Sequence, residues 1–205
     1  FTSYKVMYSS LKRCGYLYEC GHKATLRLLV GALTKRRNAK RLLLVRNPYA
    51  RLVSCFYDKF RKQPQRIEAD NFSWQALHRL MYPFLEIDEN TPAIEKADRM
   101  LSLSFDRFVR LLPQLYQKEG HLQPQVESIV TRIGVLPLRW SMDRVLKMES
   151  EYAELVDMLR IESGKRWNAS AHAPFESYYS ADLYAIVNRL YKEDFALGGY
   201  EIKKV

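Results

Sequence analysis

The segment from Leu42 to Phe60, LLLVRNPYARLVSCFYDKF, constrains the fold more than any other part of the chain. It opens with an apolar run, Leu42 to Val45, which is typical of a short buried strand. Asn47 and Pro48 follow, and these residue types are favoured at the N-cap and at the first position of a helix. An amphipathic pattern then continues to about Lys62. The segment therefore predicts a strand, a tight turn and a helix.

Three polar side chains near this turn suggest phosphate chemistry. Arg46, Arg51 and Ser54 supply two guanidinium groups and a hydroxyl close to a predicted helix N-terminus. Helix amides and the helix dipole favour an anion there, and arginine matches phosphate oxygens bidentately. The alternative from spacing alone is an ordinary strand-turn-helix unit whose arginines face solvent.

A second strand-helix unit is predicted upstream. The aromatic-rich segment Tyr16 to Cys20 is typical of a strand, Gly21 to Ala24 of a tight loop, and Thr25 to Leu33 of a helix with apolar residues at helical spacing. Two such units in succession indicate the start of a parallel sheet.

The rest of the chain is predicted to be rich in helices. One further strand is expected at Asp143 to Met148, and 164–177 is expected to be irregular. The predicted helices are Ser73 to Met81 with Ser73 as the cap, Ser104 to Tyr116, Glu149 to Leu159, and Ser180 to about Phe195, before Gly198-Gly199. With no repeat and no linker in 205 residues, we expect one α/β domain over 1–205.

The net charge of +10 is unevenly distributed. Residues 1–62 hold 15 Lys and Arg against two acidic residues, so the excess positive charge lies in the part with the candidate phosphate motif. Such a field attracts an anionic cofactor, an acidic polymer or a nucleic acid. We see no aromatic platform or reading motif beside the charge, so we expect no nucleic-acid partner. The cluster Lys35-Arg36-Arg37 is more simply a solvated turn.

The three cysteines, Cys14, Cys20 and Cys55, have no metal-ligand spacing and form no paired framework. Cys20 and Cys55 fall in segments predicted to be buried, where a free thiol acts as a small apolar side chain. That favours a reducing compartment.

The order of residues in the first segment resembles a signature of carbohydrate sulfotransferases. The matching residues are Arg46-Asn-Pro-x-x-Arg51-Leu-x-Ser54, followed by Tyr57-Asp-Lys-Phe60. The resemblance implies a P-loop-like sulfotransferase fold, with a central parallel sheet flanked by helices and a helix-rich second half. It also implies 3′-phosphoadenosine-5′-phosphosulfate (PAPS) as co-substrate and no metal. Arg46 and Ser54 are then expected to bind the 3′-phosphate of PAPS, with Arg51 nearby or supporting the helix.

Lys23, Ala24 and Thr25 resemble the loop by which this family holds the 5′-phosphosulfate. Lys23 is expected to neutralise or protonate the bridging oxygen as the sulfuryl group leaves. The loop departs from the family pattern, because only Ala24 stands between the lysine and the helix, and Gly21 precedes the lysine instead of following it. The position of the loop is therefore better supported than the roles within it.

Three downstream segments resemble the family in the expected order. Glu119-Gly-His121-Leu-Gln-Pro-Gln125 is similar to a His-x-x-Pro-Gln segment, Asp143 to Glu149 to a strand ending in Lys-x-Glu, and Tyr191 to Tyr200 to the closing helix. Histidine titrates near neutral pH and suits a general base. His121 is the first candidate for that base, His22 the second and Glu149 the third.

We therefore expect a sulfotransferase that moves the sulfuryl group from PAPS to a hydroxyl of a carbohydrate or glycoconjugate. The alternatives are a nucleotide-dependent phosphotransferase on a similar scaffold and a non-catalytic module that binds polyanions. No apolar run approaches the roughly 20 residues needed to cross a bilayer, and no signal-like segment is present. We expect a cytoplasmic, bacterial enzyme, although a lost N-terminal anchor remains open because the chain begins with Phe.

Overall fold

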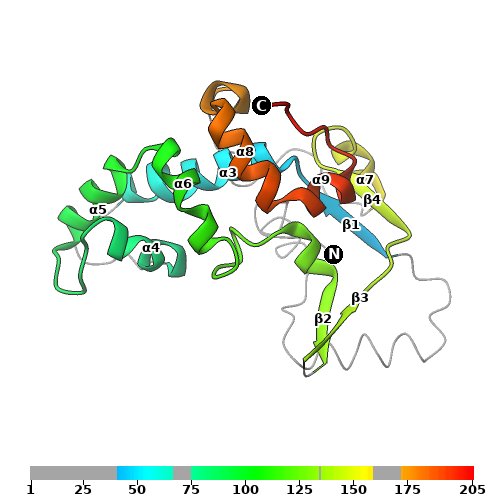
Figure 1. The fold of residues 1–205 in the computed structure, drawn as a ribbon, viewed down its shortest axis with the longest axis horizontal. Coiled ribbons are helices and arrows are strands. Elements are labelled where there is room, and N and C mark those ends of the chain that lie inside the picture. Colours follow the sequence, from blue (N-terminus) through cyan, green and yellow to red (C-terminus); the bar gives the residue numbers. More distant parts are fainter. Residues whose placement is uncertain (1–40, 67–74, 134, 159–171) are drawn as a thin grey trace. The chain divides into compact units, whose positions relative to one another are not determined.

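The computed structural model describes residues 41–66, 75–133, 135–158 and 172–205. Its contacts divide the chain into two compact units, the first made of 1–46 and 125–167, the second of 47–124 and 168–205. Figure 1 shows a mixture of helices and a few short strands, as expected for an α/β chain. The strand and helix predicted at 16–33 lie outside the described residues, and the single-domain prediction stays a prediction.

A two-stranded parallel sheet anchors the first unit. β1 (Leu42–Val45) pairs with β4 (Arg144–Lys147), so that Val45 lies opposite Lys147 at the carboxyl edge. Three residues of β1, Leu43 to Val45, are buried, as the apolar run predicts. The strands predicted at 42–45 and 143–148 are confirmed, and the two pair in parallel, in agreement with the expected parallel sheet.

An antiparallel hairpin belongs to the same unit and was not predicted. A 3₁₀ turn (Gln125–Ile129) leads into β2 (Val130–Ile133), which pairs with β3 (Leu136–Arg139). Each strand has only four residues, and Pro137 inside β3 is a residue that normally argues against a strand. The segment therefore carries no alternating pattern from which a hairpin could be recognised.

The helix that follows β4 starts later than predicted. α7 (Tyr152–Met158) begins three residues after Glu149. The intervening turn is held by Glu151, whose Oε2 accepts the backbone N–H of Lys147 at 2.7 Å. Arg144 also pairs with Glu151 in this turn and with Glu154 in the first turn of α7, so it ties β4 to the start of the helix.

The second unit is built around the helix of the sequence motif. α3 (Pro48–Tyr57) continues through a π-helical turn (Asp58–Lys62) into a short 3₁₀ turn (Pro64–Arg66). The helix predicted from Pro48 to about Lys62 is thus confirmed, with Asn47 as its cap and Pro48 in its first turn.

The other helices of this unit match the predictions unevenly. They are α4 (Ala76–Met81), a 3₁₀ turn (Tyr82–Phe84), α5 (Ala93–Ser102), α6 (Phe105–Leu115), a 3₁₀ turn (Phe175–Tyr178), α8 (Ala181–Leu190) and α9 (Lys192–Gly198). α6 confirms the helix predicted at Ser104 to Tyr116, and Ser104 is its cap. The predicted Ser73 cap is wrong, because α4 is capped by Gln75. The last predicted helix divides at Tyr191, and α5 was not predicted.

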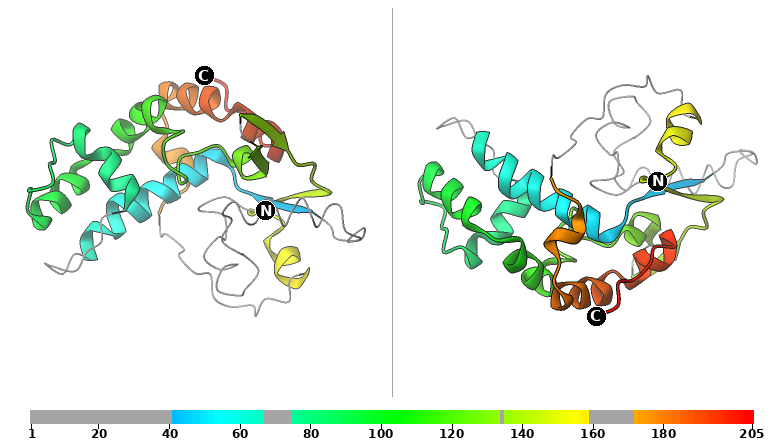
Figure 2. Two further views of the ribbon diagram at one scale, coloured as in Figure 1. Left: turned by 90° about the horizontal axis from the view of Figure 1, so that it is seen from below. Right: turned by 90° about the horizontal axis from the view of Figure 1, so that it is seen from above.

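One apolar core joins the helices of the second unit. α3 packs against α6, α6 packs against α8, and α8 packs against α9 (Figures 1 and 2). The core is notably aromatic: Phe56 contacts Phe60, Phe105 and Phe108, and Tyr49 contacts Phe195. α3 is therefore fixed on several sides by other elements of its own unit.

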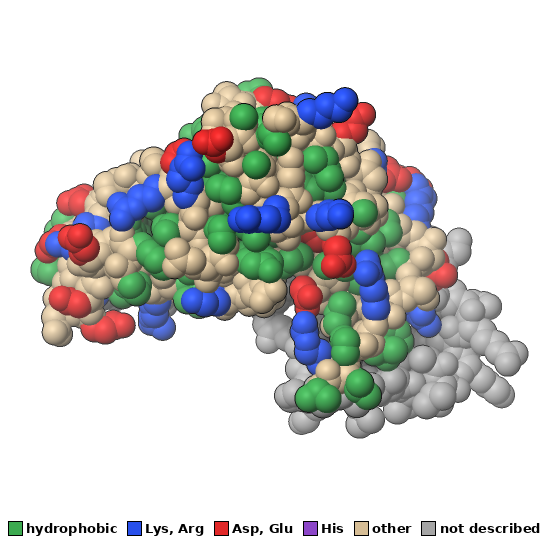
Figure 3. Space-filling model, in the orientation of Figure 1, with side chains coloured by type: hydrophobic (Ala, Val, Ile, Leu, Met, Phe, Trp, Pro, Cys, Tyr) green, Lys and Arg blue, Asp and Glu red, His purple; other side chains and the backbone are tan. Residues whose placement is uncertain are grey.

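The face shown in Figure 3 does not concentrate one sign of charge. Acidic and basic side chains are interspersed on it. Nine of the 15 basic residues in 1–62 precede Arg41 and lie outside the described residues. Within the described ranges, no helix has the length and apolarity required to traverse a bilayer.

Candidate active site

The N–H groups at the N-terminus of α3 are hydrogen-bonded by the cap residue Asn47. Asn47 Oδ1 accepts the N–H of Tyr49 at 2.9 Å and that of Ala50 at 3.4 Å, while the carbonyl of Asn47 accepts the N–H of Arg51 at 2.9 Å. Pro48 has no N–H to offer. The first-turn amides that we expected to favour an anion are therefore already engaged. An anion at this turn would be held by side chains, assisted by the helix dipole.

Arg46 follows β1 at the carboxyl edge of the parallel strand pair. Gln125 holds its backbone: the Gln125 amide accepts the N–H of Arg46 at 2.8 Å and donates to its carbonyl at 2.7 Å. Gln125 is completely buried. A buried side-chain amide that bonds both backbone groups fixes the chain direction as a neighbouring strand would.

Glu149 reaches the same edge from the end of β4. Its Oε1 lies 4.0 Å from Nε of Arg46. Ligand and catalytic residues of parallel sheets gather at carboxyl edges, and this pair lies at one. We call Arg46, Gln125 and Glu149 the strand-end cluster.

Ser54 and Arg51 lie on α3 in the second unit, and both are buried. The Arg51 guanidinium donates from Nη1 to the carbonyl of His121 at 3.4 Å and lies 3.8 Å from Oδ2 of Asp194. Its charge also stands over the Tyr191 ring, 5.3 Å from the centroid. With no exposed surface and these internal partners, Arg51 has the surroundings of a supporting residue.

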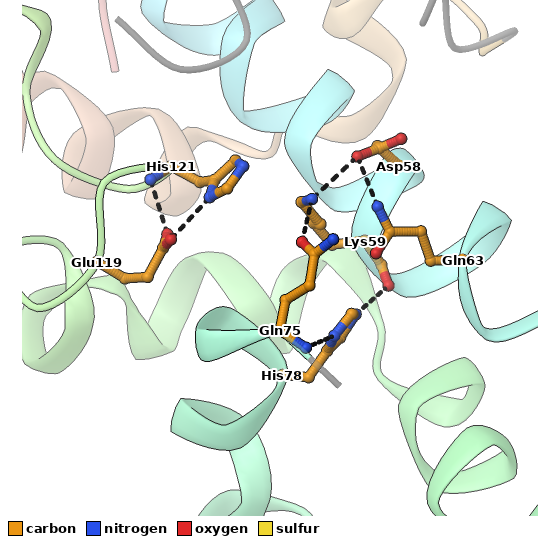
Figure 4. Close-up of polar contacts among 7 residues, drawn as sticks. All are labelled: Asp58, Lys59, Gln63, Gln75, His78, Glu119 and His121. Atoms are coloured by element: carbon orange, nitrogen blue, oxygen red, sulfur yellow. Dashed lines mark hydrogen bonds and ion pairs between the residues drawn. The ribbon is translucent and has the colours of Figure 1, made fainter. Parts of the chain in front are cut away.

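His121 forms a close pair with Glu119, as Figure 4 shows. Nδ1 of His121 lies 2.7 Å from Glu119 Oε1, and its backbone N–H donates to Oε2 at 2.7 Å. The loop is fixed at two further carbonyls, that of His121 by Arg51 and that of Leu122 by the Tyr191 hydroxyl at 2.6 Å. His121 is thus held both at its ring and at its backbone.

The charge of Glu119 is stabilised by its surroundings. Burial alone disfavours the carboxylate, but the bonds from His121 and the charge of Lys59 outweigh it and hold the pKa of Glu119 below its ordinary value. Lys59 is itself nearly buried and is held by Gln75 and by Asp58, 3.4 Å away. Glu119 is therefore a permanent anion next to His121 at neutral pH.

His78 has a different character. It is completely buried, where it accepts the N–H of Gln75 at Nδ1 (3.1 Å) and bonds the carbonyl of Lys59 through Nε2 (2.8 Å) (Figure 4). Burial lowers its pKa to about 4. A neutral ring that uses both nitrogens within the core is a structural side chain.

The other predicted site residues fall outside the described part of the chain. They are His22, Lys23, Ala24 and Thr25. Among the residues that are described, no cluster of three His, Cys, Asp or Glu side chains is arranged to hold a metal ion.

Sequence reasoning missed the partners of the site residues. Glu119 and Gln125 lie at the two ends of the Glu119–Gln125 segment that resembles the family, but only His121 was singled out within it. The Glu-Gly-His spacing was a usable signal, because a flexible glycine between them lets a carboxylate reach a ring two residues away.

These observations describe an α/β protein with a basic residue at the carboxyl edge of parallel strands, the edge where ligands of open α/β sheets bind. The chain belongs to the sulfotransferase family: the family model described as "Sulfotransferase family" matches residues 23–201. The match includes residues of both units and every sequence segment that resembles carbohydrate sulfotransferases. It is consistent with that resemblance. No curated protein and no solved structure shows a significant match to the chain.

Proposed function

We propose that the protein transfers the sulfuryl group of PAPS to a hydroxyl of a carbohydrate or glycoconjugate acceptor. The observation that carries this proposal is the family match over residues 23–201, with the Arg46-to-Ser54 motif inside it. We place the reaction in a reducing compartment such as a bacterial cytoplasm, and the burial of the Cys55 side chain in the core is consistent with this expectation.

Two groups of residues share the binding of the donor in this proposal. Arg46 and Ser54 bind the 3′-phosphate, and Arg51 supports α3 from the interior. Lys23, with the backbone of Ala24 and Thr25, holds the 5′-phosphosulfate. The two hydrogen bonds between the Gln125 side-chain amide and the Arg46 backbone, which we call the Gln125 clamp, support the role of Arg46. They orient the backbone from which the Arg46 side chain projects.

His121 takes the proton of the acceptor hydroxyl, with His22 as the second candidate. As the acceptor oxygen bonds to sulfur, the bond from sulfur to the bridging oxygen breaks, and its electron pair remains on the phosphate of adenosine 3′,5′-bisphosphate. Lys23 neutralises the charge that develops there. Positioning and electrostatics supply most of the rate in transfers of this kind.

Calorimetry with adenosine 3′,5′-bisphosphate tests the phosphate assignment. Arg46→Ala removes a charged hydrogen-bond donor and is expected to cost about 2 kcal/mol, a loss of roughly thirtyfold in affinity. The matched control is Arg132→Ala, which removes an arginine of the same unit whose side chain is 63% exposed. Equal affinity in wild type and Arg46→Ala would contradict the assignment.

A thermal-shift comparison tests the donor class. Because a ligand that binds only the folded state raises the melting temperature, adenosine 3′,5′-bisphosphate is expected to stabilise the protein more than ATP, AMP or NAD at equal concentration. Stabilisation by ATP with Mg²⁺ alone would support the phosphotransferase alternative.

A further inference from the structure

We propose that Glu119 is the positioning residue that makes Nε2 of His121 the proton-accepting atom. The inference rests on the proposed function, since it assigns the general base of that reaction to one ring nitrogen. It is carried by the contact of 2.7 Å between Glu119 Oε1 and His121 Nδ1.

The chemistry of the two groups fixes the tautomer. An ionised carboxylate can only accept hydrogen bonds, so Nδ1 of a neutral His121 ring must carry the proton that binds Glu119. The lone pair of the neutral ring is then on Nε2. A base needs a lone pair, so Nε2 is the atom that takes the acceptor proton.

The second contact of Glu119 limits rotation of the ring. Oε2 binds the backbone N–H of His121 at 2.7 Å, so a single carboxylate holds both the ring and the main chain of the same residue. The pair is largely enclosed, with side-chain exposure of 16% for His121 and 12% for Glu119. Electrostatic interactions are stronger in such a site than in water.

The pair also stabilises the product of proton transfer. When Nε2 takes the hydroxyl proton, the ring becomes an imidazolium, and Glu119 stays ionised and compensates the charge. Other charged or titratable groups lie close to this pair: Lys59 favours the ionised form of Glu119, Asp58 forms an ion pair with Lys59, and Arg51 donates to the His121 carbonyl. His78 is also near enough for a charge on His121 to lower the pKa of His78. Glu119 is in direct contact with the ring.

The opposite assignment, with Glu119 as the base and His121 as its support, fits the structure less well. A carboxylate stabilised by two bonds from His121 and by a nearby lysine is a weak proton acceptor. Imidazole is intrinsically the more basic of the two side-chain types, since the reference pKa of histidine is higher than that of glutamate.

The first experiment needs no substitution. Nitrogen-15 NMR of the histidine rings in the wild-type protein at alkaline pH reports which nitrogen is protonated, and comparison with His121→Asn assigns the signal. We expect the Nδ1–H tautomer for His121. The Nε2–H tautomer would overturn the inference whatever the activity of the protein.

The second experiment uses Glu119→Gln, which keeps the shape but removes the charge. We expect kcat to fall at least about tenfold with little change in the KM for PAPS, and the acid limb of the pH–rate profile to move to lower pH, because the imidazolium is no longer compensated. The midpoint of the His121 ring titration should move in the same direction. Glu95→Gln removes a carboxylate of the same unit that is paired on the surface with Arg99, and it serves as the control.

The outcomes separate this inference from the proposed function. Unchanged kcat and an unchanged ring titration in Glu119→Gln, with an active wild type, overturn the inference and leave the function standing. A wild type that neither binds adenosine 3′,5′-bisphosphate nor transfers sulfate from PAPS overturns the proposed function instead. Equal melting temperatures of wild type and Glu119→Gln confirm that the effects do not arise from unfolding.

Discussion

Two histidines of the second unit are held by different partners, and the difference sets what each can do. His121 faces a carboxylate that stabilises a positive ring, whereas His78 bonds a backbone carbonyl and a backbone N–H inside the core. Burial lowers the pKa of His78 to about 4. The ring next to the anion is equipped to take a proton, and the ring in the core must remain neutral for the fold.

The low pKa of His78 predicts a loss of stability in acid. The unfolded state binds a proton near pH 6.5 and the folded state only near pH 4, so unfolding takes up a proton between these values. Stability is therefore complete above about pH 6.5 and falls as the pH is lowered towards 4, by about 3 kcal/mol from this group. Urea unfolding at several pH values measures the effect.

His78→Gln is the matched variant for this prediction. Its amide can still bond a carbonyl or an N–H but does not titrate, so its stability should depend less on pH between 6.5 and 4. A wild-type curve as flat as that of the variant would show that His78 does not couple to folding.

For single residues, the sequence indicated which side chain could act as a base but not which residues contact it or the other site residues. His121 could be chosen because its residue type and its segment point to a base. Contacts between residues far apart in the chain arise from the packing of distant elements and leave no local pattern.

Among the secondary-structure elements, α3 is the one that neighbouring residues in the sequence predict best. Asn47, Pro48 and the apolar spacing after them act within a few residues, and the structure confirms the strand, the cap and the helix that they predict. The break between α8 and α9 has no such signal. Tyr191 leaves helical geometry (φ −113°, ψ 24°) where its buried hydroxyl binds the carbonyl of Leu122, a long-range contact.

The Asn47 cap predicts a measurable contribution to stability. Asn47→Ala removes the oxygen that accepts two first-turn N–H groups, and we expect a loss of about 1 kcal/mol in the free energy of unfolding. Asn47→Ser keeps a capping oxygen and should recover most of it. Urea denaturation compares the three proteins, and an unaffected Asn47→Ala variant would show that the cap adds nothing to stability.

The Gln125 clamp links the 3₁₀ turn before β2 to the end of β1. Gln125→Ala leaves the N–H and carbonyl of Arg46 without this partner, and we expect a loss of about 1–3 kcal/mol in stability. Affinity for adenosine 3′,5′-bisphosphate should also fall, because Arg46 is no longer held. Gln123→Ala, whose amide donates only to the carbonyl of Gln117 among the bonds described for it, is the control. An unchanged affinity would mean that the clamp does not serve the ligand site.

At the scale of the whole second unit, Arg51 joins segments that are widely separated in the chain. It extends from α3 to the His121 loop through a hydrogen bond and to α9 through Asp194 and the face of Tyr191. Both charged side chains of the pair are fully buried. Burial also raises the pKa of Tyr191, so its hydroxyl stays a neutral donor to the loop. The motif arginine thus connects the helix that carries Ser54 to the loop that carries the proposed base.

A double-mutant cycle separates the supporting role of Arg51 from a phosphate-binding role. Arg51→Met removes the positive charge that faces the buried Asp194 carboxylate, and we expect a loss of about 3–5 kcal/mol in stability. Arg51→Met combined with Asp194→Leu replaces the whole pair by apolar side chains and should be more stable than Arg51→Met alone. Urea denaturation gives the stabilities, and calorimetry on the double variant gives the affinity for adenosine 3′,5′-bisphosphate. If Arg51 only supports the fold, that affinity stays within a few-fold of wild type. A loss similar to that of Arg46→Ala would instead make Arg51 a ligand of the phosphate.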